Sequence, residues 1–282
     1  MNDSVRLASI DRGTGPPVVL LHGQPGSGAS WDPVTRLLEA EFRVLAPDRI
    51  GYGASPGEAL GLAANAELIA AFLEERGAVP ATVVAHSWSG GVAVLLAHRH
   101  PAMVRHVVLV GAACTEDSLN ALDRWLNVPV VGEVLTTAGL GGIGELLPRL
   151  RRFIRYVPSR YRDQVATALP DRGVLGGGRG ALGRHRRTFM IEQRALCDEL
   201  PSVQAALPEL AQPVTVVAGH WDLVVPARAA GTLARAIPGA VLKVLPRAGH
   251  FVARDDPAAL AEAIRQLPGD EPPLRFRAPQ VS

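Results

Sequence analysis

Runs of consecutive apolar residues recur along the chain, and between them lie stretches whose apolar residues are three or four positions apart. A continuous apolar run of four or five residues is typical of a strand that is buried on both faces. A shorter alternating segment precedes the first run and predicts a further strand. The predicted strands, the alternating one first, span Val5–Ile10, Val18–Leu21, Phe42–Ala46, Thr82–Ala85, Val107–Val110, Val214–Ala218 and Val241–Leu245.

The amphipathic stretches between these runs predict helices. They span Pro33–Glu41, Ala59–Arg76, Gly90–His100, Ala227–Ala236 and Pro257–Gln266. Strands that alternate regularly with helices are typical of a mostly parallel central sheet with helices on both faces. The predicted fold class is therefore α/β.

The alternation stops after Val110 and resumes at Val214. Between these positions the chain has no convincing core strand, and its helical pieces are broken by many prolines and glycines. We therefore predict two units. Residues 1–112 and 213–282 form the α/β core, and residues 113–212 form an inserted helical cap, or lid.

Composition excludes several classes of protein. The 282 residues are 48% apolar and 20% charged, which suits a packed core and excludes wholesale disorder. The two cysteines exclude a disulfide framework and a cysteine-rich zinc site, and we expect neither a metal nor a cofactor. The first residues lack the pattern of a signal peptide. Residues 77–98 carry no formal charge, but proline, glycine and polar residues interrupt this stretch, so it predicts a strand, a turn and a helix and not a membrane span. We expect a cytoplasmic protein without stable membrane insertion, and the sequence gives no indication of its oligomeric state.

Charge is distributed unevenly along the chain. The net charge is +2, but the segment from Arg149 to Arg194 holds twelve arginines and three acids, a local balance of +9, so the remainder sums to −7. This basic segment falls inside the predicted cap. It is compatible with a solvated face that pairs with the acidic core, or with attraction of an anionic substrate or membrane surface. No nucleic-acid-binding motif accompanies it, so we do not expect a nucleic-acid partner.

The strongest chemical signal is the sequence Val-Val-Ala-His-Ser-Trp-Ser-Gly-Gly, in which an apolar strand runs into a serine and then into a predicted helix. Such a turn holds the serine, here Ser87, in a strained backbone conformation with its Oγ at the carboxyl edge of the sheet. Ala85 and Ser89, two residues before and after it, are small, as the turn requires, although glycine is usual there. Ser89 is a rival nucleophile, but Ser87 stands directly at the end of the strand and is favoured.

A serine hydroxyl needs a base to remove its proton, and the base needs an acid to orient it. Asp222 and His250 follow the last two predicted strands, so the sheet topology predicts that both lie at the same edge as Ser87. Their order along the chain, Ser, Asp, His, is the one expected for this architecture. Glu116 and Asp117, which follow an earlier strand, are the alternative source of the acid.

The loop that follows the first buried strand, His-Gly-Gln-Pro-Gly, is a candidate oxyanion hole. Its glycines allow the main chain to approach a substrate closely. We expect the backbone N–H of Gln24 to be the first donor and that of Trp88 the second. A phosphate-binding glycine loop is the alternative, but the lysine of a P-loop is missing.

The sequence resembles the α/β-hydrolase superfamily over nearly its whole length. The motifs that carry the resemblance are His-Gly-X-Pro from His22, Asp-Arg-X-Gly-X-Gly-X-Ser from Asp48, the serine turn, Gly-X-X-Asp from Gly219 and Gly-His-Phe from Gly249. The resemblance implies an α/β-hydrolase fold with a cap, a triad of Ser87, Asp222 and His250, and an oxyanion hole at Gln24 and Trp88. Capped members with an aspartate nucleophile cleave epoxides or carbon–halogen bonds, whereas the serine here implies acyl transfer.

These observations together predict a serine hydrolase that cleaves carboxylic esters of small molecules through an acyl-enzyme. The same triad would also serve a lactonase, a carbon–carbon bond hydrolase or a perhydrolase, and a non-catalytic ligand receptor is the hypothesis from a different class. In this fold the cap roofs the substrate pocket. The candidate pocket residues are Trp31, Trp125, Trp221 and Phe251.

Overall fold

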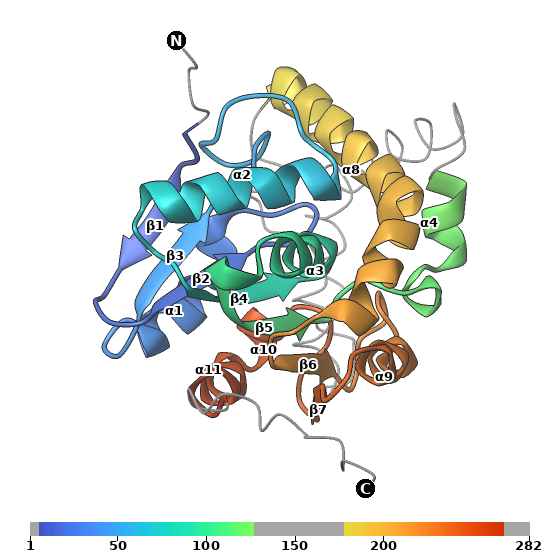
Figure 1. Ribbon diagram of the computed structural model, residues 1–282. Coiled ribbons are helices and arrows are strands. Elements are labelled where there is room, and N and C mark those ends of the chain that lie inside the picture. The colour runs from blue at the N-terminus through green and yellow to red at the C-terminus, as the bar shows by residue number, and fades with distance from the viewer. Residues whose placement is uncertain (1–5, 127–177, 268–282) are drawn as a thin grey trace, which may run out of the picture.

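The structure, a computed structural model, describes residues 6–126 and 178–267; of residues 121, 122, 125 and 178–185 it describes the backbone alone (Figure 1). Seven strands form one sheet in the order β1-β3-β2-β4-β5-β6-β7. Only β1 is antiparallel to its neighbour; all other pairs are parallel. The strands are β1 (Ser9–Arg12), β2 (Pro17–Leu21), β3 (Arg43–Pro47), β4 (Ala81–His86), β5 (Val104–Val110), β6 (Val214–Gly219) and β7 (Val241–Leu245).

Helices cover both faces of the sheet (Figure 1). One apolar cluster joins the sheet to α2, α3 and α9, and a second cluster joins its other face to α1, α10 and α11. This arrangement confirms the predicted α/β class. The helices are α1 (Asp32–Leu38), α2 (Leu62–Glu75), α3 (Ser89–Arg99), α4 (Ala121–Leu126), α8 (Gly178–Ala206), α9 (Ala227–Ala236), α10 (Val252–Asp255) and α11 (Pro257–Arg265).

Two strands differ from their sequence-based expectation. The expected strand Val5–Ile10 is represented by β1, which runs from Ser9 to Arg12; Val5 lies outside the described residues, and the N–H of Ala8 donates to the hydroxyl of Ser55 in a loop. β7 has the expected bounds, but it is not buried on both faces: Val241 is 49% exposed and Val244 is 44% exposed. β7 is an edge strand with β6 as its neighbour in the sheet, so its side chains are only partly covered.

The described part of the predicted cap consists mainly of α4 and the long helix α8, which lie next to each other beside the core (Figure 1). The second half of α8 packs into the same apolar cluster as the sheet, through Leu196, Val203 and Ala206. The carboxylate of Glu199 also accepts hydrogen bonds from the N–H groups of Leu62 and Ala63 at the start of α2. This half of α8 is thus fixed to the core.

Most of the arginine-rich segment lies outside the described residues. Within the part of the chain that the structure describes, no helix is long and apolar enough to cross a membrane. No group of three or more possible metal-ligating side chains occurs there either.

Candidate active site

The serine turn lies between β4 and α3, at the carboxyl edge of the sheet. Among the described residues other than glycine, Ser87 alone has a positive φ, 55°. Backbone hydrogen bonds to the end of β5 and to the residues that follow it hold this conformation. The N–H of Ser87 donates to the carbonyl of Val110, and the carbonyl of Ser87 accepts the N–H of Ala113. The strained backbone that the sequence predicts is therefore stabilised by the next strand.

The structure brings Ser87, His250 and Asp222 together in one hydrogen-bonded chain. His250 Nε2 lies 3.1 Å from Ser87 Oγ, and His250 Nδ1 lies 2.9 Å from Asp222 Oδ2. The other carboxylate oxygen, Oδ1, accepts the N–H groups of Val224 and Val225, each at 2.8 Å. Because a carboxylate faces Nδ1, the imidazole carries its proton there and presents a free lone pair at Nε2 to the serine.

The alternative residues lie elsewhere. Ser89 is fully buried, and its hydroxyl donates to the carbonyl of His22. Asp117 accepts a hydrogen bond from Thr232 on α9, and Glu116 faces Arg124. Neither acid is paired with His250, whose Nδ1 faces Asp222 instead.

Gly111 is a site residue that the sequence reasoning missed. It follows β5 with a φ of +50°, and a Cβ atom on it would lie 3.2 Å from Asp222 Oδ2 and 3.4 Å from His250 Nδ1. A glycine allows this backbone conformation next to the Asp–His pair. A glycine directly after a buried strand that ends at the reactive edge is the signal that could have found it.

The candidate oxyanion loop is close to the nucleophile. A Cβ atom on Gly23 would lie 3.0 Å from the Cβ of Ser87, so the main chain of the loop passes directly against the serine. Gln24 is the next residue along, and Trp88 stands at the start of α3, where backbone N–H groups have no partner within the helix. Gln24 therefore follows a residue that lies against Ser87, and Trp88 is the residue directly after the serine.

Two histidines, the buried His22 and the partly buried His86, support the site without taking part in the hydrogen-bonded chain. His22 Nε2 accepts the N–H of Arg49, which leaves Nδ1–H to donate to the carbonyl of Gly23. His86 Nε2 donates to the carbonyl of His250 at 2.8 Å. Burial lowers the pKa of His22 well below its usual range and that of His86 to about 3, so both rings are neutral.

The candidate pocket residues have different surroundings. Trp221 and Phe251 are 46% and 38% exposed, and the Phe251 ring lies 5.3 Å from that of His250. Trp31 is 1% exposed and packs in the apolar core, edge-on to His86. Trp125 belongs to α4, and its side chain lies outside the described part.

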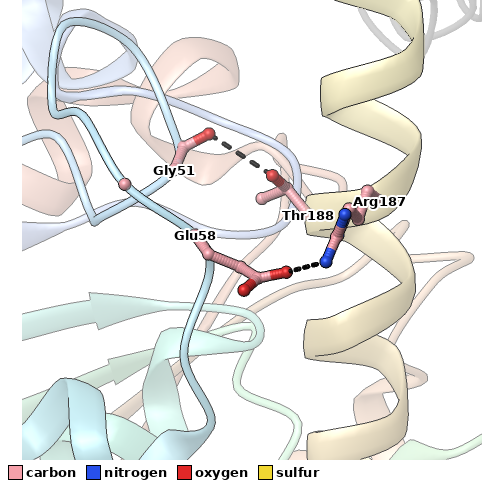
Figure 2. A pocket seen from close by; sticks show the side chains of 5 residues that line it. Gly51, Glu58, Arg187 and Thr188 are labelled. Atoms are coloured by element: carbon pink, nitrogen blue, oxygen red, sulfur yellow. Dashed lines mark hydrogen bonds and ion pairs between the residues drawn. The ribbon is translucent and has the colours of Figure 1, made fainter.

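A separate open hollow lies between α8 and the loop of residues 51–58 (Figure 2). Gly51, Gly57, Glu58, Arg187 and Thr188 line it, and none of the three hydrogen-bonded side chains does. Two of the lining side chains, Glu58 and Arg187, form an ion pair of 2.6 Å. It marks where α8 meets the core.

Comparison with known proteins identifies the family. A family model described as the alpha/beta hydrolase family matches residues 18–263, so this chain belongs to that family and its sheet has the α/β-hydrolase fold. The magnesium-chelatase 30 kDa subunit of Rhodobacter capsulatus is 31% identical over 86% of this chain and 84% of that protein. A 2-hydroxymuconate semialdehyde hydrolase of Pseudomonas putida is 27% identical over 86% and 83% of the respective chains. The structure of a thermophilic esterase from Thermogutta terrifontis is 26% identical, with a TM-score of 0.69 over 92% of this chain and 91% of that one.

Proposed function

We propose that this protein is a cofactor-independent serine hydrolase that cleaves carboxylic esters of small molecules through an acyl-enzyme. The observation that carries the proposal is the chain of hydrogen bonds from Ser87 Oγ to His250 Nε2 and from His250 Nδ1 to Asp222. A serine hydroxyl paired with an imidazole that an acid orients is the arrangement that activates a hydroxyl for attack on an acyl carbon.

In the proposed reaction, Ser87 Oγ bonds to the acyl carbon while its proton passes to His250 Nε2. The carbonyl oxygen becomes an oxyanion, which the N–H groups of Gln24 and Trp88 stabilise. The alcohol leaves as the carbon–oxygen bond breaks, and it takes the proton from His250. Water then repeats the sequence on the acyl-enzyme, with His250 as base, and releases the acid and free Ser87. Asp222 stabilises the imidazolium in both halves.

A second candidate activity uses the same residues. The similarity to a 2-hydroxymuconate semialdehyde hydrolase favours hydrolysis of a carbon–carbon bond, because the compound in that name carries no ester. The similarity to the thermophilic esterase favours ester hydrolysis, and the esterase resembles this chain in sequence and fold over more than nine-tenths of its length. We therefore place ester hydrolysis first.

Labelling with a fluorophosphonate tests the proposal, because this reagent reacts with activated serines. The wild-type protein should be labelled, Ser87→Ala should not, and Ser89→Ala, the matched serine control, should keep its label because the Ser89 hydroxyl is bonded internally. A protein without any adduct, as expected of a non-catalytic receptor, would refute the proposal. An adduct that persists in Ser87→Ala would place the nucleophile elsewhere. Turnover of 4-nitrophenyl esters of increasing chain length then shows which size of acyl group the site accepts.

A further inference from the structure

A fully buried ion pair joins α8 to the loop that follows β3. The guanidinium of Arg49 contacts both carboxylate oxygens of Glu192, and neither side chain is exposed. The hydroxyl of Tyr52 donates to the same carboxylate at 2.7 Å. A buried ion pair adds little stability compared with apolar residues of the same volume, so stability alone is a weak reason for one at this position.

The remaining contacts of Arg49 lead to the candidate oxyanion loop. Its Nε donates to the carbonyl of His22 at 3.2 Å, and its Nη2 donates to the carbonyl of Gly23 at 3.1 Å. These are the two residues directly before Gln24. The guanidinium also lies over the indole of Trp88, 4.4 Å from the ring centroid. One side chain therefore contacts the neighbourhoods of both candidate oxyanion donors.

One turn of α8 makes further contacts with the same two donor residues. The side-chain amide of Gln24 donates to the carbonyl of Phe189 at 2.6 Å. The indole N–H of Trp88 donates to the backbone carbonyl of Glu192 at 2.9 Å. Since Phe189 and Glu192 are three residues apart on one helix, a single rigid segment holds Gln24 and Trp88 from the side of the cap.

We propose that Arg49 and Glu192 are positioning residues for the oxyanion hole, through which α8 sets the placement of the backbone at Gln24 and Trp88. This inference rests on the proposed serine-hydrolase function. Oxyanion donors act only where they lie about 2.7–3.1 Å from the position of the developing charge, so loss of their support reduces turnover while ground-state binding changes little. Substitution of a residue that served stability alone would not lower turnover selectively while leaving ground-state binding unchanged.

The sharpest variant is Arg49→Lys. Lysine keeps the positive charge opposite Glu192 but replaces a rigid fork of donors by one compact ammonium, which cannot reach the carboxylate and both loop carbonyls together. We expect kcat for 4-nitrophenyl butyrate to fall by about tenfold to a hundredfold, with KM within about threefold of the wild type. The inhibition constant of an alkyl trifluoromethyl ketone, whose serine adduct carries an oxyanion, should rise by the same factor as kcat/KM falls.

Arg187→Lys is the matched control. Arg187 lies on the same helix and is paired with a carboxylate of the same core, Glu58, but its side chain is 75% exposed (Figure 2). The same substitution there should leave kcat, KM and the ketone inhibition constant at wild-type values. The double variant Arg49→Met/Glu192→Met removes both buried charges, so it leaves neither of them unpaired, and the folded variant should still show the kinetic loss.

The outcomes separate the inference from the proposed function. Wild-type protein that takes up no fluorophosphonate would overturn the proposed function, and the inference with it. Labelled wild-type protein, together with a folded Arg49→Lys or double variant whose kcat and ketone inhibition constant are unchanged, would overturn the inference alone. Equal losses in Arg49→Lys and Arg187→Lys would likewise show that α8 acts only by holding the fold.

Discussion

Asp222 is held from two sides, which makes Asp222→Asn an informative substitution. The asparagine has the same shape, but its carbonyl oxygen must replace Oδ1 to keep the hydrogen bonds from Val224 and Val225. Its NH₂ group then faces Nδ1 of His250, which lies 2.9 Å from the other oxygen in the wild-type protein. A donor at this position selects the imidazole tautomer that is protonated at Nε2, and this tautomer cannot accept the proton of Ser87.

The expected loss follows from these contacts. Turning the amide over would sacrifice two backbone hydrogen bonds of about 1 kcal/mol each, so the productive orientation is populated at about 3% or less. That alone reduces turnover by about thirtyfold. The asparagine also lacks the charge that stabilises the imidazolium in the transition state. Together we expect kcat to fall by about 10⁴, the effect of the same substitution in a serine protease triad.

The assay is turnover of 4-nitrophenyl butyrate at neutral pH, with thermal unfolding as the check on folding. Asp117→Asn is the matched control, because Asp117 lies at the alternative acid position and bonds Thr232 on the surface. It should keep full activity. The reasoning is refuted if folded Asp222→Asn retains more than a tenth of the wild-type kcat, or if Asp117→Asn loses as much.

Three further predictions concern stability and reactivity. Gly111→Ala should lower the free energy of unfolding by about 1–2 kcal/mol because the φ of Gly111 is positive, and it should reduce activity because the new methyl group lies beside Asp222. Gly77 has a φ of +58° and open space around it, so Gly77→Ala should lose a similar amount of stability but keep full activity. His86 stays neutral in the folded protein, where burial lowers its pKa to about 3, but it binds a proton below about pH 6.5 in the unfolded chain. The contribution of His86 to the stability is therefore complete above about pH 6.5 and falls with decreasing pH, by about 2 kcal/mol at pH 5. Urea unfolding at about pH 5 and above pH 6.5 should accordingly show a smaller decrease in His86→Asn than in the wild type. Burial raises the pKa of the Cys114 thiol to about 12. A thiol reagent at about pH 8 should therefore leave Cys114 unmodified in the native protein and modify it only after denaturation, and peptide mapping measures both.

The sequence alone predicted most of the sheet and the three residues of the hydrogen-bonded chain. This worked because each signal is local: an apolar run marks a strand, and the residue that follows it lies at the carboxyl edge. Ser87, Asp222 and His250 each follow such a run, so the topology of a parallel sheet was enough to place them together.

The residues that support the site were not predictable in this way. Arg49 and Glu192 are 143 positions apart, and nothing in their local sequences indicates that they meet. The sequence of β7 is apolar except for Lys243 and so resembles the central strands, but its exposure depends on its place at the edge, which only the strand order reveals. Contacts between distant segments and the position of a strand within a sheet are properties of the assembled fold.

The attachment of α8 has a consequence for exchanging the predicted cap between members of the family. The chain leaves the sheet after β5 and returns at β6, and these two strands are neighbours, so an insertion of any length can in principle be spliced between them. A chimaera that replaces residues 113–212 as a block would nevertheless remove Phe189, Glu192 and Glu199. Their hydrogen-bond partners in the core would then lose these contacts. A transplant that ends before Thr188 would retain them, so the rest of the predicted cap could be exchanged while the part of α8 that contacts the core is inherited unchanged.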